Sequence, residues 1–156
     1  MLHITIPGYG NLRLRHLVLD FNGTLACDGR LLPGVRERLD LLAETLKIHV
    51  LTADTFGRAT KEMSAIPCEL AVLPPENQDG AKRRYLEPLG PEAVVAVGNG
   101  RNDRGMLEAA ALGLAVVQAE GAAVETILAA DVVVPDILAA LDLLAKPMRL
   151  TATLRA

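Results

Sequence analysis

Aromatic residues are scarce in this sequence: tryptophan is absent, and phenylalanine and tyrosine together account for only 3% of the residues. A buried core must therefore be built mainly from leucine, alanine and valine, within a hydrophobic fraction of 51%. Cysteine is also rare, and Cys27 and Cys68 have neither metal-ligand spacing nor a histidine partner. We therefore expect free thiols in a reducing compartment, and neither a disulfide framework nor a zinc site.

Long apolar runs and long basic runs are missing as well. No stretch approaches the length of a membrane span, and the first residues lack the basic and apolar regions of an export signal, so we expect a soluble, cytoplasmic protein. The formal net charge is −3 and the isoelectric point is near 5.6. Nucleic acids and membranes are therefore not expected as partners.

Apolar runs alternate with amphipathic segments along most of the chain, which is the pattern of a mainly parallel sheet with crossover helices. The sequence predicts an α/β fold, a Rossmannoid α/β/α sandwich of three layers, in a single domain spanning 1–156. Turn residues at 7–11 separate two apolar runs and predict a β-hairpin within 1–15. The core is expected at 16–145, whereas the tail at 146–156 has no clear periodicity.

Each predicted strand is a short apolar run that ends in turn residues, and each predicted helix spaces its apolar residues three or four positions apart. Strands are predicted at 2–6, 12–14, 16–20, 47–51, 69–73, 93–97, 114–117 and 132–134. Helices are predicted at 35–46, 58–65, 79–89, 103–111, 122–129 and 137–144.

Two polar segments follow buried strands and carry the candidate chemistry. The first is Asp20-Phe21-Asn22-Gly23-Thr24, and the second is Gly98-Asn99-Gly100-Arg101-Asn102-Asp103. Because the loops after parallel strands share one edge of the sheet, Asp20 and Asp103 are expected to meet in one crevice. Two carboxylates beside amides, a hydroxyl and glycine-rich main chain suit a phosphate and a divalent cation.

Further polar residues fall at the same edge. Thr52 ends the next strand and is followed by Ala53 and Asp54, and Lys82 lies near the start of a helix from which its ammonium could offset phosphate charge. Simpler explanations exist for single positions, since Asp20 can cap a turn and Lys82 can be a solvated cation. The occurrence of the whole set in this order favours a shared site.

The motifs resemble those of the haloacid dehalogenase (HAD) superfamily of phosphohydrolases and phosphotransferases. Within that superfamily they are most similar to the phosphorylation domain of P-type ATPases and to small soluble proteins like it. The resemblance covers about 17–134 and rests on 20–24, 51–54, Lys82, 98–103 and 130–133. It implies a HAD-like fold, and the short spacing between motifs leaves no room for the cap domain or the nucleotide-binding domain of larger members.

The resemblance implies a role for each matching position. Asp20, with Asn22 beside it, would be the catalytic pair, and Asp20 would attack phosphorus to form an aspartyl-phosphate. The phosphoryl oxygens would be held by Asn22, Gly23, Thr24, Thr52, Ala53 and Lys82. The cofactor Mg²⁺ would be held by Asp20, the main-chain carbonyl of Asn22, Asn99 and Asp103. Asp54 and Asn102 would support this set.

Two positions depart from the family pattern. Asn22 stands where the phosphatases have an aspartate that protonates the leaving group and activates water, and an amide does neither. Asn99 stands where the family often has a metal-binding aspartate, so the affinity for Mg²⁺ should be lower.

The sequence therefore predicts a Mg²⁺-dependent phosphoryl-transfer enzyme that is a slow phosphatase for a small phosphorylated substrate. The alternative is a catalytically weak or inactive regulatory module that binds phosphate and metal. An open site without a cap also leads us to expect a homo-oligomer, with the hairpin at 2–14 as a candidate interface.

Overall fold

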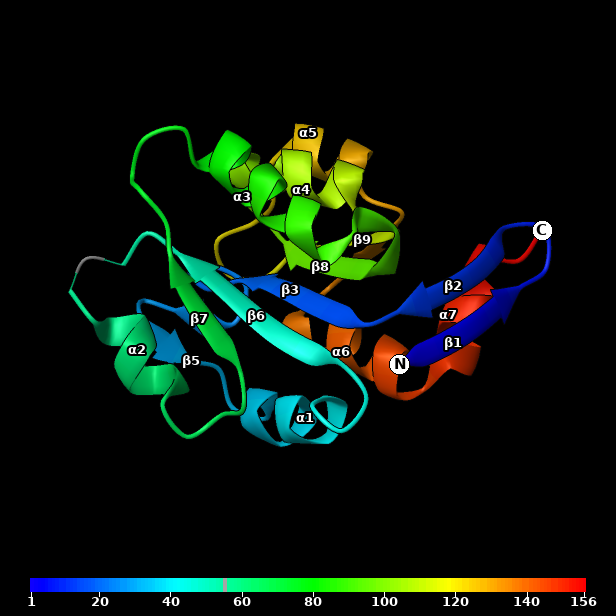
Figure 1. Ribbon diagram of the computed structural model, residues 1–156, viewed down its shortest axis with the longest axis horizontal. Helices are drawn as coiled ribbons and strands as arrows, with labels where there is room; N and C mark the ends of the chain where they lie inside the picture. Colours follow the sequence, from blue (N-terminus) through cyan, green and yellow to red (C-terminus); the bar gives the residue numbers. More distant parts are fainter. Residues whose placement is uncertain (55) are drawn as a thin grey trace.

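A six-stranded parallel sheet forms the centre of the computed structural model, which describes residues 1–54 and 56–156 (Figure 1). Its strands are β3 (His16–Asp20), β6 (Lys47–Thr52), β7 (Glu69–Val72), β8 (Val94–Gly98), β9 (Leu112–Val116) and β10 (Val132–Val134). They lie in the order β10-β9-β8-β3-β6-β7, and every neighbouring pair is parallel. The predicted parallel sheet is confirmed, and β3 lies between the two strands that carry the other motifs.

Helices cover both faces of this sheet, as Figure 1 shows. One face carries α3 (Gln78–Leu86), α4 (Arg104–Ala109) and α5 (Val124–Ala129), and the other carries α1 (Val35–Leu42) and α6 (Ile137–Ala145). Successive side chains of a strand point to opposite faces, so β3 sends Val18 into one core cluster and Leu17 and Leu19 into the other. The three-layer architecture is therefore confirmed, with both faces of the sheet buried.

The predicted N-terminal hairpin is present and extends beyond the sheet, beside a helix at the C-terminal end (Figure 1). It consists of β1 (Leu2–Ile6) and β2 (Gly10–Leu14), which pair antiparallel. Helix α7 (Pro147–Leu154), which the sequence did not predict, packs against β1, and its Leu150 is fully buried. Because the hairpin buries its apolar face within the same chain, only its polar face is left for another copy. The homo-oligomer and its interface stay predictions.

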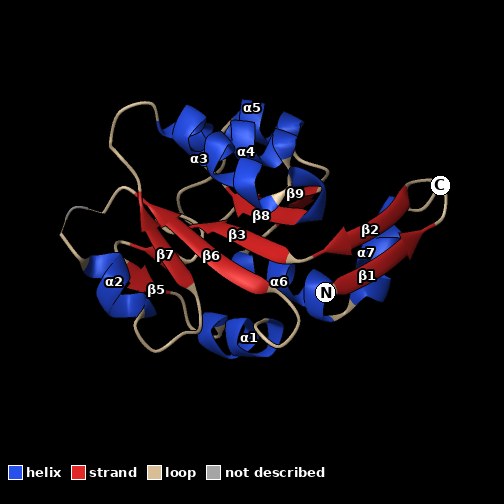
Figure 2. Ribbon diagram, viewed as in Figure 1, coloured by secondary structure: helices blue, strands red, loops and turns tan. Residues whose placement is uncertain are grey.

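A second, smaller hairpin was not predicted. It consists of β4 (Ala26–Cys27) and β5 (Arg30–Leu31), drawn in red near α2 (Arg58–Met63) in Figure 2, where β5 is labelled. Its turn places Asp28 at φ 51° and Gly29 at φ 78°, the left-handed conformation that two-residue hairpin turns require. This hairpin directly follows the first polar motif and leads into α1.

The ends of several helices differ from the prediction. The helix predicted at 79–89 ends at Leu86 and continues as two short 3₁₀ helices, Glu87–Leu89 and Pro91–Ala93, because proline lacks the N–H group that an α-helix needs. The helix predicted at 103–111 is preceded by a 3₁₀ turn, Arg101–Asp103.

Between β3 and α3 the described residues hold only β4, β5, α1, β6, α2 and β7, so this stretch contains no cap domain, as predicted. None of the helices in the described residues has both the length and the apolar character that crossing a bilayer requires.

Candidate active site

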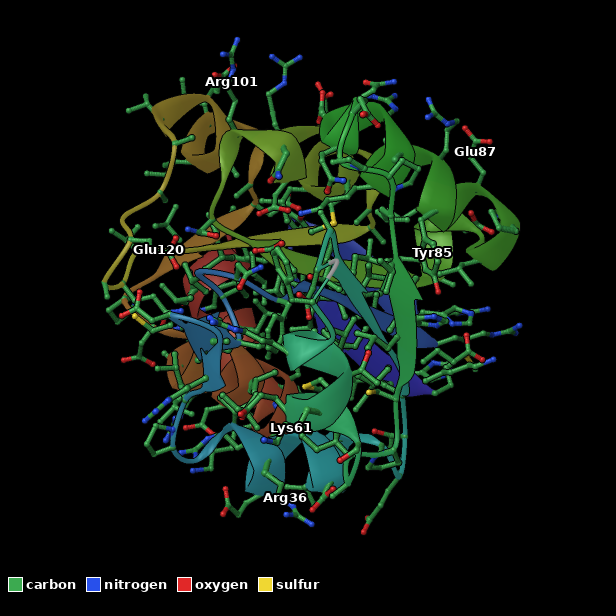
Figure 3. The ribbon with its side chains drawn as sticks, turned by 90° about the vertical axis from the view of Figure 1, so that its left-hand side faces the viewer. Arg36, Lys61, Tyr85, Glu87, Arg101 and Glu120 are labelled. Atoms are coloured by element: carbon green, nitrogen blue, oxygen red, sulfur yellow. The ribbon has the colours of Figure 1, made fainter. Side chains whose placement is uncertain are left out.

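The carboxyl ends of β3, β6 and β8 bring the predicted polar segments together. Asp20 is the last residue of β3, Thr52 is the last of β6, and Asn99 directly follows β8. Figure 3 views the molecule from this end, with Glu120, Arg101 and Lys61 labelled around it. A crevice of about 230 Å³ opens here, lined by Asp20, Asn22, Thr52, Ala53, Gln78, Lys82, Asn99, Gly100, Asn102 and Glu120.

Lys82 joins the two candidate carboxylates. Its Nζ atom lies 2.7 Å from Asp20 Oδ1 and 2.7 Å from Asp103 Oδ1, and 3.4 Å from Asn102 Oδ1. The lysine is 1% exposed, although it comes from a helix whose neighbouring arginines face solvent. The alternative that Lys82 is a solvated surface cation is therefore excluded.

Two buried carboxylates share this single ammonium, which leaves an excess of negative charge. Burial and, next, the charge of Asp103 raise the pKa of Asp20 to about 7, against the opposing effects of Lys82 and Thr24. Burial acts to lower the pKa of Lys82, but the two carboxylates outweigh it and the pKa is raised, so the side chain remains an ammonium. The site is thus electrostatically suited to accept a further cation.

Asp103 holds the second motif in place. Its Oδ2 atom accepts hydrogen bonds from the main-chain N–H groups of Asn99 (3.0 Å) and Gly100 (2.9 Å), while Oδ1 faces Lys82. Only glycine fits at position 98, because a Cβ atom there would lie 2.5 Å from the Asp103 carboxyl carbon. Both oxygens of Asp103 are therefore engaged, and its contact with a metal or its waters stays a prediction.

Thr24 connects the first motif to the second. Its hydroxyl oxygen is fully buried and lies 3.1 Å from Asp20 Oδ2 and 3.3 Å from Asn99 Oδ1. Asn99 Nδ2 donates to the Gly121 carbonyl at 3.0 Å, which directs Oδ1 towards Thr24. A Cβ atom on Gly23, whose φ is +81°, would lie 2.7 Å from the Asn99 amide nitrogen. Thr24 thus orients the Asp20 carboxylate, and its direct contact with phosphate stays a prediction.

The loop after β6 is held by Asp54. The Asp54 carboxylate accepts hydrogen bonds from the N–H groups of Ala59 (2.6 Å) and Phe56 (3.0 Å), and these bonds, that from Ala59 above all, lower its pKa. The N–H group of Asp54 donates to the Thr52 hydroxyl oxygen at 3.1 Å. Asp54 therefore stabilises the loop after β6, and its supporting role in the site stays a prediction. Thr52 and Ala53 line the crevice.

The sequence did not single out Gln118, which ties three parts of the site together. Its Nε2 donates to the main-chain carbonyls of Gly23 (3.0 Å) and Thr24 (2.6 Å), and its Oε1 accepts from the N–H of Ile137 (3.1 Å). Gln118 and Glu120 follow β9 at the same edge of the sheet. The rule that residues after a parallel strand reach this edge could have found both.

The donor atoms fit a magnesium ion that keeps several of its waters. Within 1–54 and 56–156, no three His, Cys, Asp or Glu side chains are grouped so that they could hold a metal. The Asp20 carboxylate, the Asn99 amide oxygen and the Asn22 carbonyl are hard oxygen donors of the kind that Mg²⁺ prefers. The excess negative charge around Lys82 favours the same ion. The described residues do not supply a complete set of metal ligands, so phosphate and water would have to complete the coordination of Mg²⁺.

Comparison of sequences finds a related protein of undetermined role. No protein-family profile matches the chain. Over 79 residues, 48% of the chain, the sequence is 48% identical to the uncharacterized protein MJ0073 from Methanocaldococcus jannaschii, and the match covers 85% of that protein.

Comparison of structures finds the same fold at low sequence identity. A Legionella pneumophila protein assigned to subfamily III A of the HAD superfamily of hydrolases matches 90% of this chain and 88% of its own, with a TM-score of 0.69 and 16% identity. The 3-deoxy-D-manno-octulosonate 8-phosphate phosphatase from Moraxella catarrhalis, solved with magnesium, phosphate and KDO, matches 92% and 94%, with a TM-score of 0.67 and 14% identity. The chain therefore belongs to the family of the M. jannaschii protein MJ0073, and its fold is that of the HAD superfamily.

Proposed function

We propose that the protein is a Mg²⁺-dependent phosphoryl-transfer enzyme of the HAD type that acts as a slow phosphatase on a small phosphorylated substrate. The observation that carries this proposal is the arrangement of Asp20 at the end of β3, where it faces a polar crevice and contacts the buried ammonium of Lys82. The M. catarrhalis phosphatase, which shares the fold, was solved with magnesium and phosphate, and this supports the choice of ligands.

In the first step, a carboxylate oxygen of Asp20 attacks phosphorus. The new O–P bond forms while the bond from phosphorus to the ester oxygen breaks, and the electron pair leaves with that oxygen. Thr24 and Lys82 orient the carboxylate, and Lys82 offsets the phosphoryl charge. Bound Mg²⁺ would be held by Asp20, the Asn22 carbonyl and Asn99, and would neutralise charge on the phosphoryl oxygens. Asn22 has no acidic proton, so the leaving oxygen takes its proton from water.

In the second step, water attacks phosphorus and the bond to Asp20 breaks, which restores the carboxylate and releases phosphate. The proton of the attacking water goes to solvent, because the Asn22 amide does not accept it. Loss of a general acid–base typically costs about 10²–10⁴-fold in rate. Slow turnover is therefore expected even with the rest of the site in place.

The same two asparagines favour a second candidate, a regulatory module that binds phosphate and metal without useful turnover. Asn22 removes the proton carrier, and Asn99 removes one negative charge from the metal site. Phosphate or a phosphate analogue would then stabilise the folded protein without being formed from an ester.

Release of phosphate from p-nitrophenyl phosphate in the presence of Mg²⁺ distinguishes these candidates. We expect slow release that Asp20→Asn abolishes and that Asp28→Asn preserves, since Asp28 is an exposed aspartate in the β4–β5 turn. Release that survives Asp20→Asn would contradict the proposed enzyme. Thermal stabilisation by beryllofluoride with Mg²⁺, without any release, would support the binding module.

A further inference from the structure

A second cavity of about 290 Å³ lies beside the crevice, and the mechanism does not use it. It is lined by the β4–β5 hairpin and the segment that follows it, the loop after β9, and the start of α6. Its walls are mainly apolar, with Ala26 and Ile137 almost fully buried and Leu32 and Leu138 partly buried. This composition contrasts with the polar lining of the crevice itself.

The cavity and the crevice are neighbours that share a lining residue. Glu120 lines both of them, and Gly23, which lines the cavity, directly follows Asn22, which lines the crevice. Figure 3 shows Glu120 at one side of the end of the molecule that carries the site. A substrate whose phosphoryl group is held at Asp20 could therefore extend its other end past Glu120 into the cavity.

The walls are held in a fixed arrangement. The Gln118 side chain is bonded to the first motif through the Gly23 and Thr24 carbonyls and to the start of α6 through the Ile137 N–H. The Asp136 carboxylate accepts from the Ala139 N–H at 2.7 Å and so caps the same helix. Such a preformed apolar pocket with a few polar groups at its rim is typical of a small-molecule subsite.

Charge and size limit what the cavity can hold. Its charged lining residues are Glu120 and Asp136, both acidic, and neither lysine nor arginine lines it within the described residues. An anionic group is therefore disfavoured. A dry apolar cavity of about 150 Å³ holds a benzene ring, so this larger one has room for a single ring or a branched alkyl group.

We propose that this cavity binds an uncharged apolar part of the substrate's leaving group. This inference rests on the proposed phosphatase function. The substrate is then a phosphate monoester of an alcohol that carries an aryl or branched alkyl group.

The first test compares 2-phenylethyl phosphate with ethyl phosphate, both esters of primary alcohols, so that leaving-group acidity differs little. We expect kcat/KM for phosphate release to be higher for the phenylethyl ester by about tenfold or more. Leu138→Trp, which fills the cavity, should remove this preference while release from ethyl phosphate persists. Leu128→Trp is the matched control, because Leu128 is 79% exposed on α5 and lies outside the cavity. Equal kcat/KM for the two esters, or a preference that survives Leu138→Trp, would overturn the proposal.

The second test does not require turnover, because Cys27 lines the cavity and is partly exposed. We expect 2-phenylethyl phosphate with Mg²⁺ to slow maleimide labelling of Cys27 several-fold, whereas ethyl phosphate at the same concentration leaves the rate unchanged. Cys68 is the internal reference, since it lies just before β7 and outside the cavity, and its labelling rate should not change.

The two tests separate the cavity from the catalytic proposal. Protection of Cys27 without phosphate release would support the apolar subsite and contradict the phosphatase. Release without protection of Cys27 and without preference between the esters would overturn the subsite and leave the phosphatase standing. A change in particle mass by light scattering for Leu138→Trp alone would also overturn the proposal, because the cavity would then be an interface between two copies of the chain.

Discussion

Lys82 controls the electrostatic balance of the site, because its ammonium is the charged donor that contacts both Asp20 and Asp103. The sequence predicted that Lys82 lies in the site, but its position next to Arg83 and Arg84 did not indicate that its ammonium would contact both carboxylates. The helix turns Lys82 towards the sheet edge and its arginine neighbours towards solvent, and only the packing of α3 against α4 and the second motif fixes that orientation.

Replacement of Lys82 by methionine should therefore destabilise the fold. Without the ammonium, two buried carboxylates face each other, and breaking a buried ion pair in this way typically costs about 3–5 kcal/mol. Urea unfolding of Lys82→Met, with Lys61→Met as the control at an exposed lysine on α2, measures the loss. Added Mg²⁺ should recover more stability in Lys82→Met than in the wild type, since the ion then meets an uncompensated pair of charges. Equal effects of the two substitutions would contradict the bridging role.

Asn22 is the residue that we expect to limit turnover. Asn22→Asp places a carboxyl group where a proton must be given and taken, so the rate of phosphate release should rise by about 10²-fold or more. Initial rates with p-nitrophenyl phosphate and Mg²⁺ measure the change, and Asn11→Asp, at an exposed asparagine of the N-terminal hairpin, is the control. A rate that stays at the wild-type level would indicate that the crevice does not position a phosphoryl group at Asp20.

At the scale of elements, the central strands could be predicted because parallel strands buried on both faces are nearly continuous apolar runs. Elements that depend on contacts with residues far away in the sequence could not be predicted. Helix α7 has only eight residues, of which Leu150 alone is fully buried, and it is covered by α6 and by the hairpin from the other end of the chain. Strands β4 and β5 have two residues each, too few for a periodic pattern, although the Asp28-Gly29 pair is a recognisable turn signal.

The site shows the same division. Asp20, Thr52 and Asn99 lie at one edge of the sheet, as predicted. Each of them ends or follows a buried strand, and the carboxyl ends of parallel strands lie at the same edge of a sheet. The same rule could have placed Gln118 at this edge, but its hydrogen bonds are to main-chain carbonyls, which have no signature in the sequence, so its role could not be predicted. The chemical roles of these residues stay predictions until they are measured.

Leu150 tests whether α7 belongs to the core. It is fully buried, so Leu150→Ala should lower the free energy of unfolding by about 2–5 kcal/mol through lost contacts and a residual cavity. Met148 lies on the same helix but is 78% exposed, and Met148→Ala should change stability by less than about 0.5 kcal/mol. Urea denaturation of both variants gives the comparison. A small effect at Leu150 would show that hairpin and helix are not stably packed.

Across the whole molecule, polar side chains gather at both ends of the sheet, and the cluster at the amino ends lies away from the candidate active site. His49 is fully buried there, with its Nε2 atom 3.1 Å from His16 Nδ1 and its Nδ1 atom 3.0 Å from the Tyr85 hydroxyl. Glu69 lies 3.4 Å from His49 Nδ1 and is paired with Lys47. A neutral His49 can satisfy both contacts, since a neutral imidazole has one nitrogen that donates and one that accepts.

This cluster should make the stability of the whole fold depend on pH. Burial and, next, His16 lower the pKa of His49 to about 4 from its ordinary value of 6.5, while Glu69 opposes and Lys47 reinforces the shift. Between pH 6.5 and about pH 4 the unfolded chain therefore binds a proton at His49 that the folded protein does not bind, so the His49 contribution lowers stability as the pH falls. Asp20, whose pKa is raised to about 7, acts in the opposite direction, because the folded protein binds a proton there that the unfolded chain does not.

Between pH 7 and pH 5 the expected loss from His49 alone is about 2 kcal/mol, from 1.36 kcal/mol for each unit of separation between the pH and the ordinary pKa. Urea unfolding of the wild type and of His49→Gln at both pH values isolates this contribution. Between pH 7 and pH 5 the stability of His49→Gln should fall by about 2 kcal/mol less than that of the wild type, because the glutamine does not titrate. His3→Gln, at an exposed histidine of the hairpin, should leave the dependence as it is in the wild type. Because His49 lies on β6 between β3 and β7, its protonation strains three strands at once. The acid transition should therefore remain cooperative, and the same change in stability between pH 7 and pH 5 in His49→Gln and in the wild type would contradict the role of His49.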